Sequence, residues 1–269
     1  MRVLAVAMGG VVLLGLLGWL GLRVPANPLP EVALAPAEPQ RVAMPDDLPA
    51  PVERFYEELY GERLPVIDSA VITGRGTMRI AGVTLPVRFR FAHTTGDGYR
   101  HHIETTIFGL RLLTVRETYL DGTARLELPF GISQGSNVDQ GANLALWAEA
   151  VWTPAAWATD PRVRWEAVSD DTALLVVPAG DAEETFVARF DPRTGMLRLL
   201  ESMRFKGQDD DHKTLWLNEV VSWGEVDGRT MPIETALTWL DDGKPWAKLT
   251  TEEVRYNADV SEYLRQRGP

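Results

Sequence analysis

The segment "LPVRFRF" at residues 85–91 alternates apolar and basic side chains. Val87, Phe89 and Phe91 are separated from one another by arginines. Successive side chains of a β-strand point to opposite faces of a sheet, so this alternation predicts a strand with one buried face. Parallel strands are buried on both faces and tend to have continuous apolar runs, so the segment also favours an antiparallel sheet.

Similar alternation and repeated turn signals extend this pattern over most of the chain. In "ARLEL" at residues 124–128, apolar and charged residues alternate again. Asp-Gly pairs and related sequences, which favour tight turns, separate the runs. They are Asp97-Gly98, Asp121-Gly122, "DPRTG" at 191–195, Asp227-Gly228 and Asp242-Gly243. We predict about five strands in residues 66–128 and six or seven in residues 162–256, which gives a mainly β (α+β) fold with about 11 antiparallel strands.

The stretch "LALWAEAVWTPAAWA" at residues 144–158 lies between the two groups of predicted strands. We predict a helix that is capped by Ser136 or Asp139 and runs to about Trp152. Proline fits the first position of a helix, so Pro154 is expected to begin a second short helical turn that carries the third tryptophan of the stretch.

The predicted central helix has almost no polar face. At 100° per residue, Leu144, Trp147 and Val151 share one side, Leu146 lies on the other, and Glu149 is the only charge in the stretch. A helix that is apolar all round is usually covered on both sides. One side is expected to face the sheet. The alternatives for the other side are packing under a loop or helix, lining an apolar cavity, and docking on lipid or a partner.

A shorter helix is predicted at residues 48–61, "LPAPVERFYEELYG". Pro51 suits its first turn and Gly61 suits the position just past its end. Val52 and Phe55 lie on its apolar face.

An apolar run of 20 residues, 3–22, lies between Arg2 and Arg23. At 1.5 Å per residue it spans roughly 30 Å, the thickness of a bilayer core. We predict an uncleaved transmembrane anchor at residues 1–23. The alternative is a signal peptide cleaved near "VPA" at residues 24–26, although the apolar core of a signal peptide is usually shorter.

Residues 24–49 contain seven prolines, which favour an extended conformation and indicate a semi-stiff tether. Residues 50–269 are then a single β-rich domain. The free N-terminal amine favours the cytoplasmic side, so we expect a single-pass protein of the cytoplasmic (inner) membrane with its domain on the extracytoplasmic side.

The composition excludes several functional classes. The net charge is −11 and the isoelectric point is about 4.9, which argues against nucleic-acid binding because phosphate contacts need a positive surface. The chain has no cysteine, so disulfides, thiol nucleophiles and thiolate metal sites are excluded.

Polar motifs do not predict a catalytic or metal site. In "HHIE" at residues 101–104, His102 and Glu104 share one strand face, but a metal site needs a further ligand such as His212, and a solvated pair explains them equally well. "DDDH" at residues 209–212 does not match the calcium-binding loop motif and is interpreted as a solvated turn. "GISQGSN" at residues 131–137 contains no nucleophile motif. We therefore assign no catalytic residue, metal or cofactor.

Several segments resemble a bacterial family of unknown function with an N-terminal membrane segment and a β-rich domain. They are "LPAPVERFY", "YLDGTARLEL", "LWAEAVWTPAAWATDPRVRWEAVSDDTALLVV", "FDPRTGMLRLLESMRF" and "DGRTMPIETALTWL". The order of elements also resembles the outer-membrane lipoprotein carriers. That second resemblance implies a curved antiparallel sheet, or half-open β-barrel, plugged by helices, whose concave face binds acyl chains.

These observations lead to three functional hypotheses. The first is membrane-tethered binding of a lipid or other apolar ligand in the cell envelope. The second is an envelope protein-interaction or sensor module, and the third is a hydrolase without a readable motif. For the first hypothesis the candidate ligand-binding residues are Leu144, Trp147, Val151, Trp152, Trp157, Phe89 and Phe91. The expected partners are a lipid or apolar small molecule and the membrane, with no nucleic acid.

Overall fold

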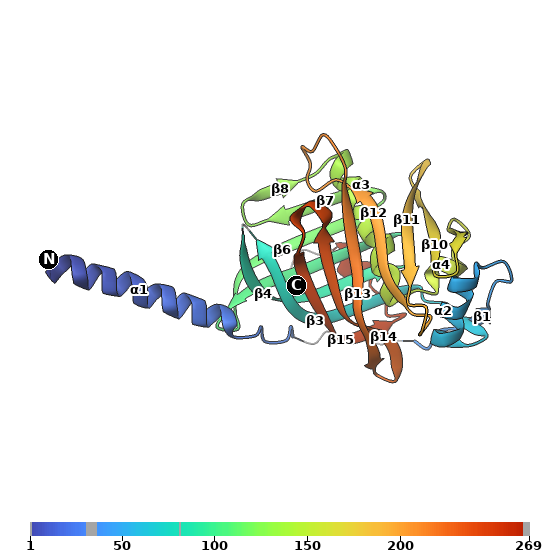
Figure 1. The fold of residues 1–269 in the computed structure, drawn as a ribbon, viewed down its shortest axis with the longest axis horizontal. Coiled ribbons are helices and arrows are strands. Elements are labelled where there is room, and N and C mark those ends of the chain that lie inside the picture. Colours follow the sequence, from blue (N-terminus) through green and yellow to red (C-terminus); the bar gives the residue numbers. More distant parts are fainter. Residues whose placement is uncertain (1, 31–36, 81, 266–269) are drawn as a thin grey trace.

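The structure, a computed structural model, describes residues 2–30, 37–80 and 82–265 (Figure 1). Within them, one open sheet of thirteen antiparallel strands curves around a helical segment. The strands are, in chain order, β3 (Ser69–Ile80), β4 (Val83–Thr94), β5 (Gly98–Ile107), β6 (Leu110–Leu120), β7 (Thr123–Leu128), β8 (Gly131–Ser133), β9 (Arg164–Ser169), β10 (Thr172–Ala179), β11 (Ala182–Phe190), β12 (Leu197–Arg204), β13 (Thr214–Val226), β14 (Arg229–Trp239) and β15 (Pro245–Tyr256).

The strand order explains the position of the helical segment. The order across the sheet is β8-β7-β6-β5-β4-β3-β15-β14-β13-β12-β11-β10-β9, so two meanders meet where β3 pairs with β15. Consequently β8 and β9, which are separated only by the helical segment, lie at opposite edges of the sheet. The chain crosses between these edges as α3 (Ser136–Glu149), the 3-10 turn η1 (Ala150–Trp152) and α4 (Ala156–Thr159). Helix α3 contacts β6, β7, β10 and β12, which belong to both halves.

The predicted antiparallel, mainly β fold is confirmed, but the predicted number of about eleven strands was wrong. Residues 66–128 contain the expected five strands. Residues 162–256 contain seven, the upper of the two numbers expected. The remaining strand, β8, is only three residues long and lies within "GISQGSN", where no alternation marks it.

The helices lie near their predicted positions, but α4 begins at Ala156, two residues after Pro154, and the predicted cap of α3 was wrong. Helix α2 (Ala50–Tyr60) ends at Gly61, as expected. Helix α3 is preceded by Gly135 with a φ of 112°, so neither Ser136 nor Asp139 is its cap. Instead, Oδ1 of Asp139 accepts a hydrogen bond from the backbone N of Ala124 at 2.6 Å, which ties α3 to β7. Two further short helices, η2 (Leu240–Asp242) and α5 (Ser261–Arg265), were not predicted.

The N-terminal helix α1 (Arg2–Arg23) projects from one end of the sheet (Figure 1). In the described part of the chain, no helix combines the length and hydrophobicity needed to cross a membrane. The structure therefore does not support the predicted transmembrane anchor. The end of α1 contacts the β5–β6 turn, where the backbone N of Phe108 donates to the carbonyl O of Gly21 at 2.8 Å.

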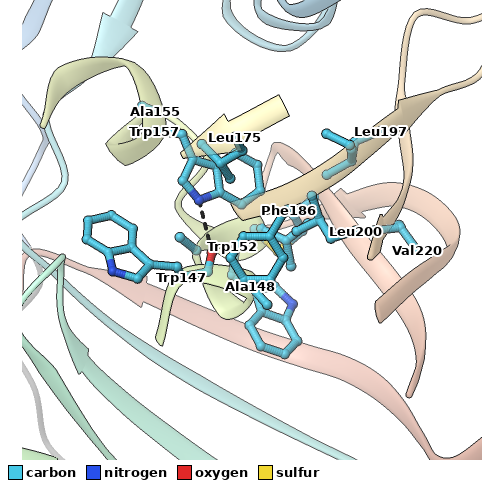
Figure 2. Packing of buried hydrophobic residues seen from close by; sticks show 14 of the residues in the cluster. Trp147, Ala148, Trp152, Ala155, Trp157, Leu175, Phe186, Leu197, Leu200 and Val220 are labelled. Carbon is cyan, nitrogen blue, oxygen red and sulfur yellow. Dashed lines mark hydrogen bonds between the residues drawn. The ribbon is translucent and has the colours of Figure 1, made fainter. Parts of the chain in front are cut away.

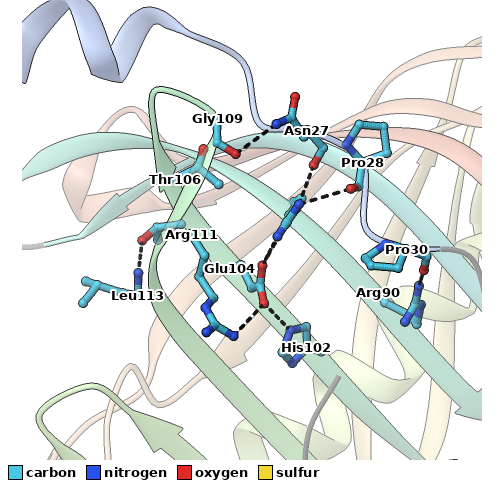
Figure 3. A network of polar contacts seen from close by, with 12 residues as sticks. Asn27, Pro28, Pro30, Arg90, His102, Glu104, Thr106, Gly109, Arg111 and Leu113 are labelled. Atoms are coloured by element: carbon cyan, nitrogen blue, oxygen red, sulfur yellow. Dashed lines mark hydrogen bonds and ion pairs between the residues drawn. The ribbon is translucent and has the colours of Figure 1, made fainter.

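The described part of the proline-rich segment contacts the domain. Nη1 of Arg88 donates to the carbonyl oxygens of Asn27 and Pro28, both at 3.1 Å, and Arg90 donates to that of Pro30 (Figure 3). Proline lacks a backbone N–H, so carbonyl acceptors are the groups that such a segment offers to a sheet. These arginines alternate with buried phenylalanines in the segment 85–91, so its polar face binds the N-terminal chain.

The predicted tether continues beyond Pro30, and the structure describes residues 37–49 of it. Residues 31–36 lie outside the described residues. Beyond them, β1 (Arg41–Ala43) pairs with β2 (Arg63–Pro65) in a separate two-stranded sheet. This short ladder places the start of α2 next to the main domain.

Gly74 is predicted to be essential for the junction between the two meanders. A Cβ atom at this position of β3 would lie 2.0 Å from the carbonyl oxygen of Thr250 in β15. Because that oxygen belongs to the backbone, the strands must separate to admit a side chain. Gly74→Ala should lower the free energy of unfolding by about 1–3 kcal/mol, measured by denaturant titration.

Gly207→Ala is the matched control, since the nearest atom to its Cβ, Oδ1 of Asp210, lies at 4.0 Å. Its unfolding free energy should stay within about 0.5 kcal/mol of the wild-type value. Equal stability of the two variants would contradict the role assigned to Gly74.

Candidate functional site

A cavity of about 380 Å³ lies between the concave face of the sheet and the helical segment. Most of its lining side chains are apolar, and they come from both meanders of the sheet. Those from the sheet include Met78, Phe91, Ile103, Val115, Trp216, Leu237, Trp239 and Leu249. A cavity of this size and polarity is typical of sites for small apolar or amphiphilic ligands.

The helical segment contributes Asn137 and a stripe of five further residues to the cavity wall. Val138, Gly141, Ala145, Glu149 and Trp152 follow one another at intervals of three or four residues. This spacing places them on one side of the helix. Two of the five are the small residues glycine and alanine, so the space in front of the helix stays open.

The cavity reaches the surface near the β7–β8 turn. Leu128, Pro129 and Phe130 line it there, and Phe130 is 86% exposed. An exposed phenylalanine is unfavourable in water unless it meets an apolar partner. This turn therefore forms an apolar entrance to the cavity.

A cationic side chain lies inside the cavity. The guanidinium of Arg204, at the end of β12, is 4.5 Å from the ring centroid of Trp216 and 5.8 Å from that of Trp239. Nε of Arg204 is buried and has no hydrogen-bond partner. The indole Nε1 atoms of Trp216 and Trp246 are likewise buried and without a partner. Buried donors without acceptors are costly, so these three groups would favour a ligand that supplies acceptor atoms.

The far wall of the cavity carries a cluster of two histidines and a carboxylate. Nε2 of His101 is 2.7 Å from Oε2 of Glu149, and Nε2 of His93 is 3.2 Å from the same oxygen. On its other side, Nδ1 of His101 is 3.6 Å from Oε2 of Glu117. The hydroxyl of Tyr99 donates to Oε1 of Glu117 at 2.8 Å. His101, Glu117 and Glu149 all line the cavity.

These groups shift one another's pKa values strongly. Burial lowers the pKa of His101, but the carboxylates of Glu149 and Glu117 outweigh burial and raise that pKa to about 9. Burial raises the pKa of Glu149, but His101 and His93 outweigh it and lower that pKa to about 2. The pKa of His93 is lowered, chiefly by burial. At neutral pH, His101 and Glu149 therefore form a charged pair.

Only two of the seven predicted ligand-binding residues line the cavity. These are Phe91 on β4 and Trp152 in η1. The other five lie in the main hydrophobic core, away from the cavity wall: Leu144, Trp147, Val151, Trp157 and Phe89. Trp147 and Trp157 are each 1% exposed, and the indole of Trp157 donates to the carbonyl O of Trp147 at 2.9 Å (Figure 2).

The remaining sides of α3 are covered as well. Ala142 and Leu146 pack against Tyr99 and Tyr119 in a second apolar cluster. The helix is thus enclosed by core on two sides and faces the cavity on a third. The residue that distinguishes the third side in the sequence is Glu149, the lone charge of the stretch.

The polar motifs noted in the sequence lie elsewhere. His102 points to the outer face of β5, where its Nε2 is 3.1 Å from Oε1 of Glu104 (Figure 3). Glu104 also accepts a hydrogen bond from Nε of Arg88 at 2.7 Å. His212 is exposed beside Asp211. In the same loop, Asp210 accepts backbone hydrogen bonds as an ordinary turn residue.

The sequence interpretation missed His93, His101, Glu117, Glu149 and Arg204. The motif "HHIE" drew attention to His102, whereas its neighbour His101 points into the cavity. Adjacent strand residues face opposite sides, so the alternation itself contained that signal.

Comparisons with solved structures found proteins of low sequence identity. A LolA superfamily protein from Nitrosomonas europaea is 11% identical, with a TM-score of 0.47 over 81% of this chain and 96% of that chain. A DUF1329 family protein from Desulfovibrio piger is 10% identical, with a TM-score of 0.43 over 75% of this chain and 91% of that chain.

A putative outer membrane lipoprotein-sorting protein domain from Vibrio parahaemolyticus is 11% identical, with a TM-score of 0.42 over 79% of this chain and 93% of that chain. No curated protein matches the sequence. A family model matches residues 38–249, which include α2 and all the strands and helices that form the cavity up to the middle of β15. The resemblance to a family of unknown function is thereby confirmed, and the chain belongs to that family, DUF6544.

Proposed function

We propose that this protein binds a lipid or other apolar ligand in the cavity between the sheet and α3, and that the ligand carries an acidic head group. The observation that carries this proposal is the combination of an apolar cavity of about 380 Å³ with the unpartnered guanidinium Nε of Arg204 inside it. An apolar chain gains about 0.8 kcal/mol for each CH₂ group that leaves water. The cavity wall offers it apolar contacts on both sides.

The position of Arg204 favours an acidic head over a neutral one. Its guanidinium lies near the rings of Trp216 and Trp239. Its charge also helps to lower the pKa of Glu117 in the same cavity, but its buried Nε has no hydrogen-bond acceptor. A charge-assisted hydrogen bond to a carboxylate or phosphate is stronger than one to a neutral group, and Arg suits planar anions in particular. The indole donor of Trp216, whose ring lies against Arg204, would add a neutral hydrogen bond to the same head group.

Filling the cavity should prevent binding. Ala247 is 1% exposed and lines the cavity from the middle of the sheet. Ala247→Phe should lower the affinity for a dansyl-labelled fatty acid at least about tenfold, or 1.4 kcal/mol. The measurement is energy transfer from the cavity tryptophans to the dansyl group.

Val221→Phe adds the same ring on an exposed position of β13, which is 53% exposed in the wild type, and should leave the affinity unchanged. Equal affinities of the two variants would contradict binding in the cavity. Native mass spectrometry of the purified chain should also detect a co-purified lipid.

The acidic head group has a separate test. The wild-type protein should bind a fatty acid about tenfold more tightly than the fatty alcohol of the same chain length. Arg204→Gln should remove this preference and leave the affinity for the alcohol nearly unchanged, as measured by competition against the dansyl probe. Arg198→Gln, on the exposed side of the same strand, is the matched control. Loss of preference in both variants would indicate a general charge effect.

A second candidate is a protein-interaction or sensor module of the envelope. Leu128, Phe130 and Ile132 at the β7–β8 turn are 43%, 86% and 52% exposed, which suits an apolar docking site. Under this alternative the wild-type protein would show no saturable binding of the fatty acid.

We further propose that the domain acts on the extracytoplasmic side of the cytoplasmic membrane. The apolar run at residues 3–22 supports this location, because the free N-terminal amine before it favours the cytoplasmic side. Protease added to intact spheroplasts should digest or release the domain, as followed by immunoblotting against residues 50–269. Protection of the domain in spheroplasts, with digestion only after lysis, would place it in the cytoplasm.

A further inference from the structure

We propose that His93, His101 and Glu149 bind a divalent transition-metal ion, for which Zn²⁺ is the best fit, at the far wall of the cavity. The inference is independent of the proposed lipid binding. It depends on the convergence of three ligand residues from three different elements, on a buried nitrogen that lacks a well-aligned hydrogen bond, and on a carboxylate that orients one of the histidines.

The three side chains are held by rigid elements. His93 is on β4 and His101 on β5, and these strands pair so that Phe91 lies opposite His101 and Tyr99 lies opposite His93. The two histidines are thus diagonal neighbours on the concave face. Glu149 approaches them from the last turn of α3. A site on strands and a packed helix keeps its ligands in place.

The donor set and its dimensions suit zinc. Two imidazole nitrogens and one carboxylate oxygen are common ligands of Zn²⁺, which in catalytic and binding sites retains a fourth position for a small molecule. All three candidate ligand atoms lie within 4.8 Å of one another. Ligands about 2.1 Å from a tetrahedral ion are about 3.4 Å apart. The present separations of 2.7 and 3.2 Å would need to widen by about 0.7 and 0.2 Å respectively.

His93 provides the second, independent observation. The residue is 5% exposed, and its Nε2 atom is buried without a hydrogen bond of good geometry. That atom nevertheless lies 3.2 Å from Oε2 of Glu149. A charged pair of His101 with Glu149 alone would explain two of the three residues, but it leaves this nitrogen with only a poorly aligned contact to the same carboxylate oxygen. A metal ion would employ the nitrogen.

The surroundings of His101 resemble the support that metal-bound histidines receive. Nδ1 faces the carboxylate of Glu117 at 3.6 Å, and Tyr99 donates to that carboxylate. Ring stacking at a centroid distance of 4.0 Å holds the imidazole against Tyr99. A carboxylate behind a ligating histidine fixes its orientation and raises its basicity. Zn²⁺ would displace the proton from Nε2 of His101, which is released to solvent, and its two positive charges would balance the carboxylates of Glu117 and Glu149.

The site would have two consequences for the protein. A bound ion would link α3 to the sheet through both β4 and β5. In addition, His101 and Glu149 line the cavity, so the remaining coordination position would face the cavity and accept an acceptor atom from a small molecule there.

The test is metal binding by the full-length, chelator-treated protein in detergent, without added lipid. Zn²⁺ should bind with a stoichiometry of one, as measured by calorimetry and elemental analysis. Co²⁺ should give the intense visible absorption of a four-coordinate site, and excess Zn²⁺ should abolish it. Zn²⁺ should also raise the melting temperature, because the ion binds only the folded site.

The histidines supply a matched pair of variants. His101→Gln and His102→Gln change adjacent residues of β5, each of which faces a glutamate, but only His101 has a third ligand near it. His101→Gln should weaken Zn²⁺ binding about 100-fold, and His102→Gln should leave it unchanged. Circular dichroism establishes that each variant is folded. His93→Gln is the second variant, because His93 contributes no well-formed hydrogen bond to the fold.

Several results would overturn the proposal. The first is that the wild-type protein binds no stoichiometric Zn²⁺. The second is a Co²⁺ spectrum typical of the hydrated six-coordinate ion. The third is an equal loss of Zn²⁺ affinity in His101→Gln and His102→Gln. If the histidine variants fail to fold, the Co²⁺ spectrum of the wild-type protein still shows whether a four-coordinate metal site is present. Fatty-acid binding can be measured in the chelator-treated protein whether or not the metal site exists, so the two proposals can fail separately.

Discussion

The structure depends on one constraint, which is that the chain must cross the inside of its own sheet. Strands β8 and β9 lie at opposite edges, and the segment from α3 to α4 connects them through the concave face. A segment in that position meets side chains of the sheet in almost every direction. It must therefore be apolar nearly all round, and backbone hydrogen bonds must be satisfied internally, which a helix achieves. The unusual composition of residues 144–158 follows from the topology.

The same constraint explains which part of the site was predictable. A helix without a polar face indicates that it is enclosed, and this expectation was correct. It does not indicate which side faces open space, because core and cavity walls are both apolar. Large residues such as Trp147 fill the side where the sheet is close. Small residues, Gly141 and Ala145, mark the side where space remains. Ala142 and Ala148 are equally small but lie in the core, so neither residue size nor hydrophobicity alone identifies the cavity side.

The strands were easier to predict than the cluster of histidines. Alternation along residues 85–91 is a local signal, and it also separates the arginines that hold the N-terminal segment from the phenylalanines of the core. The neighbourhood of His93 and His101 depends on the register between β4 and β5, and that of Glu149 on the crossing helix 48 residues away. Such contacts are set by tertiary structure. The three-residue strand β8 was missed for the same reason, since pairing with β7 alone defines it.

The location of Glu149 indicates why the helix is not entirely apolar. Placing a carboxylate and a histidine inside a protein removes both from water, and their attraction often only offsets this cost. Apolar residues of similar volume would serve the packing of α3 equally well or better. The charged groups also lie at the wall of an open cavity, and further buried donors of Arg204, Trp216 and Trp246 lack partners there. Polar groups that packing does not require, gathered around one apolar space, support the proposed binding of a ligand there.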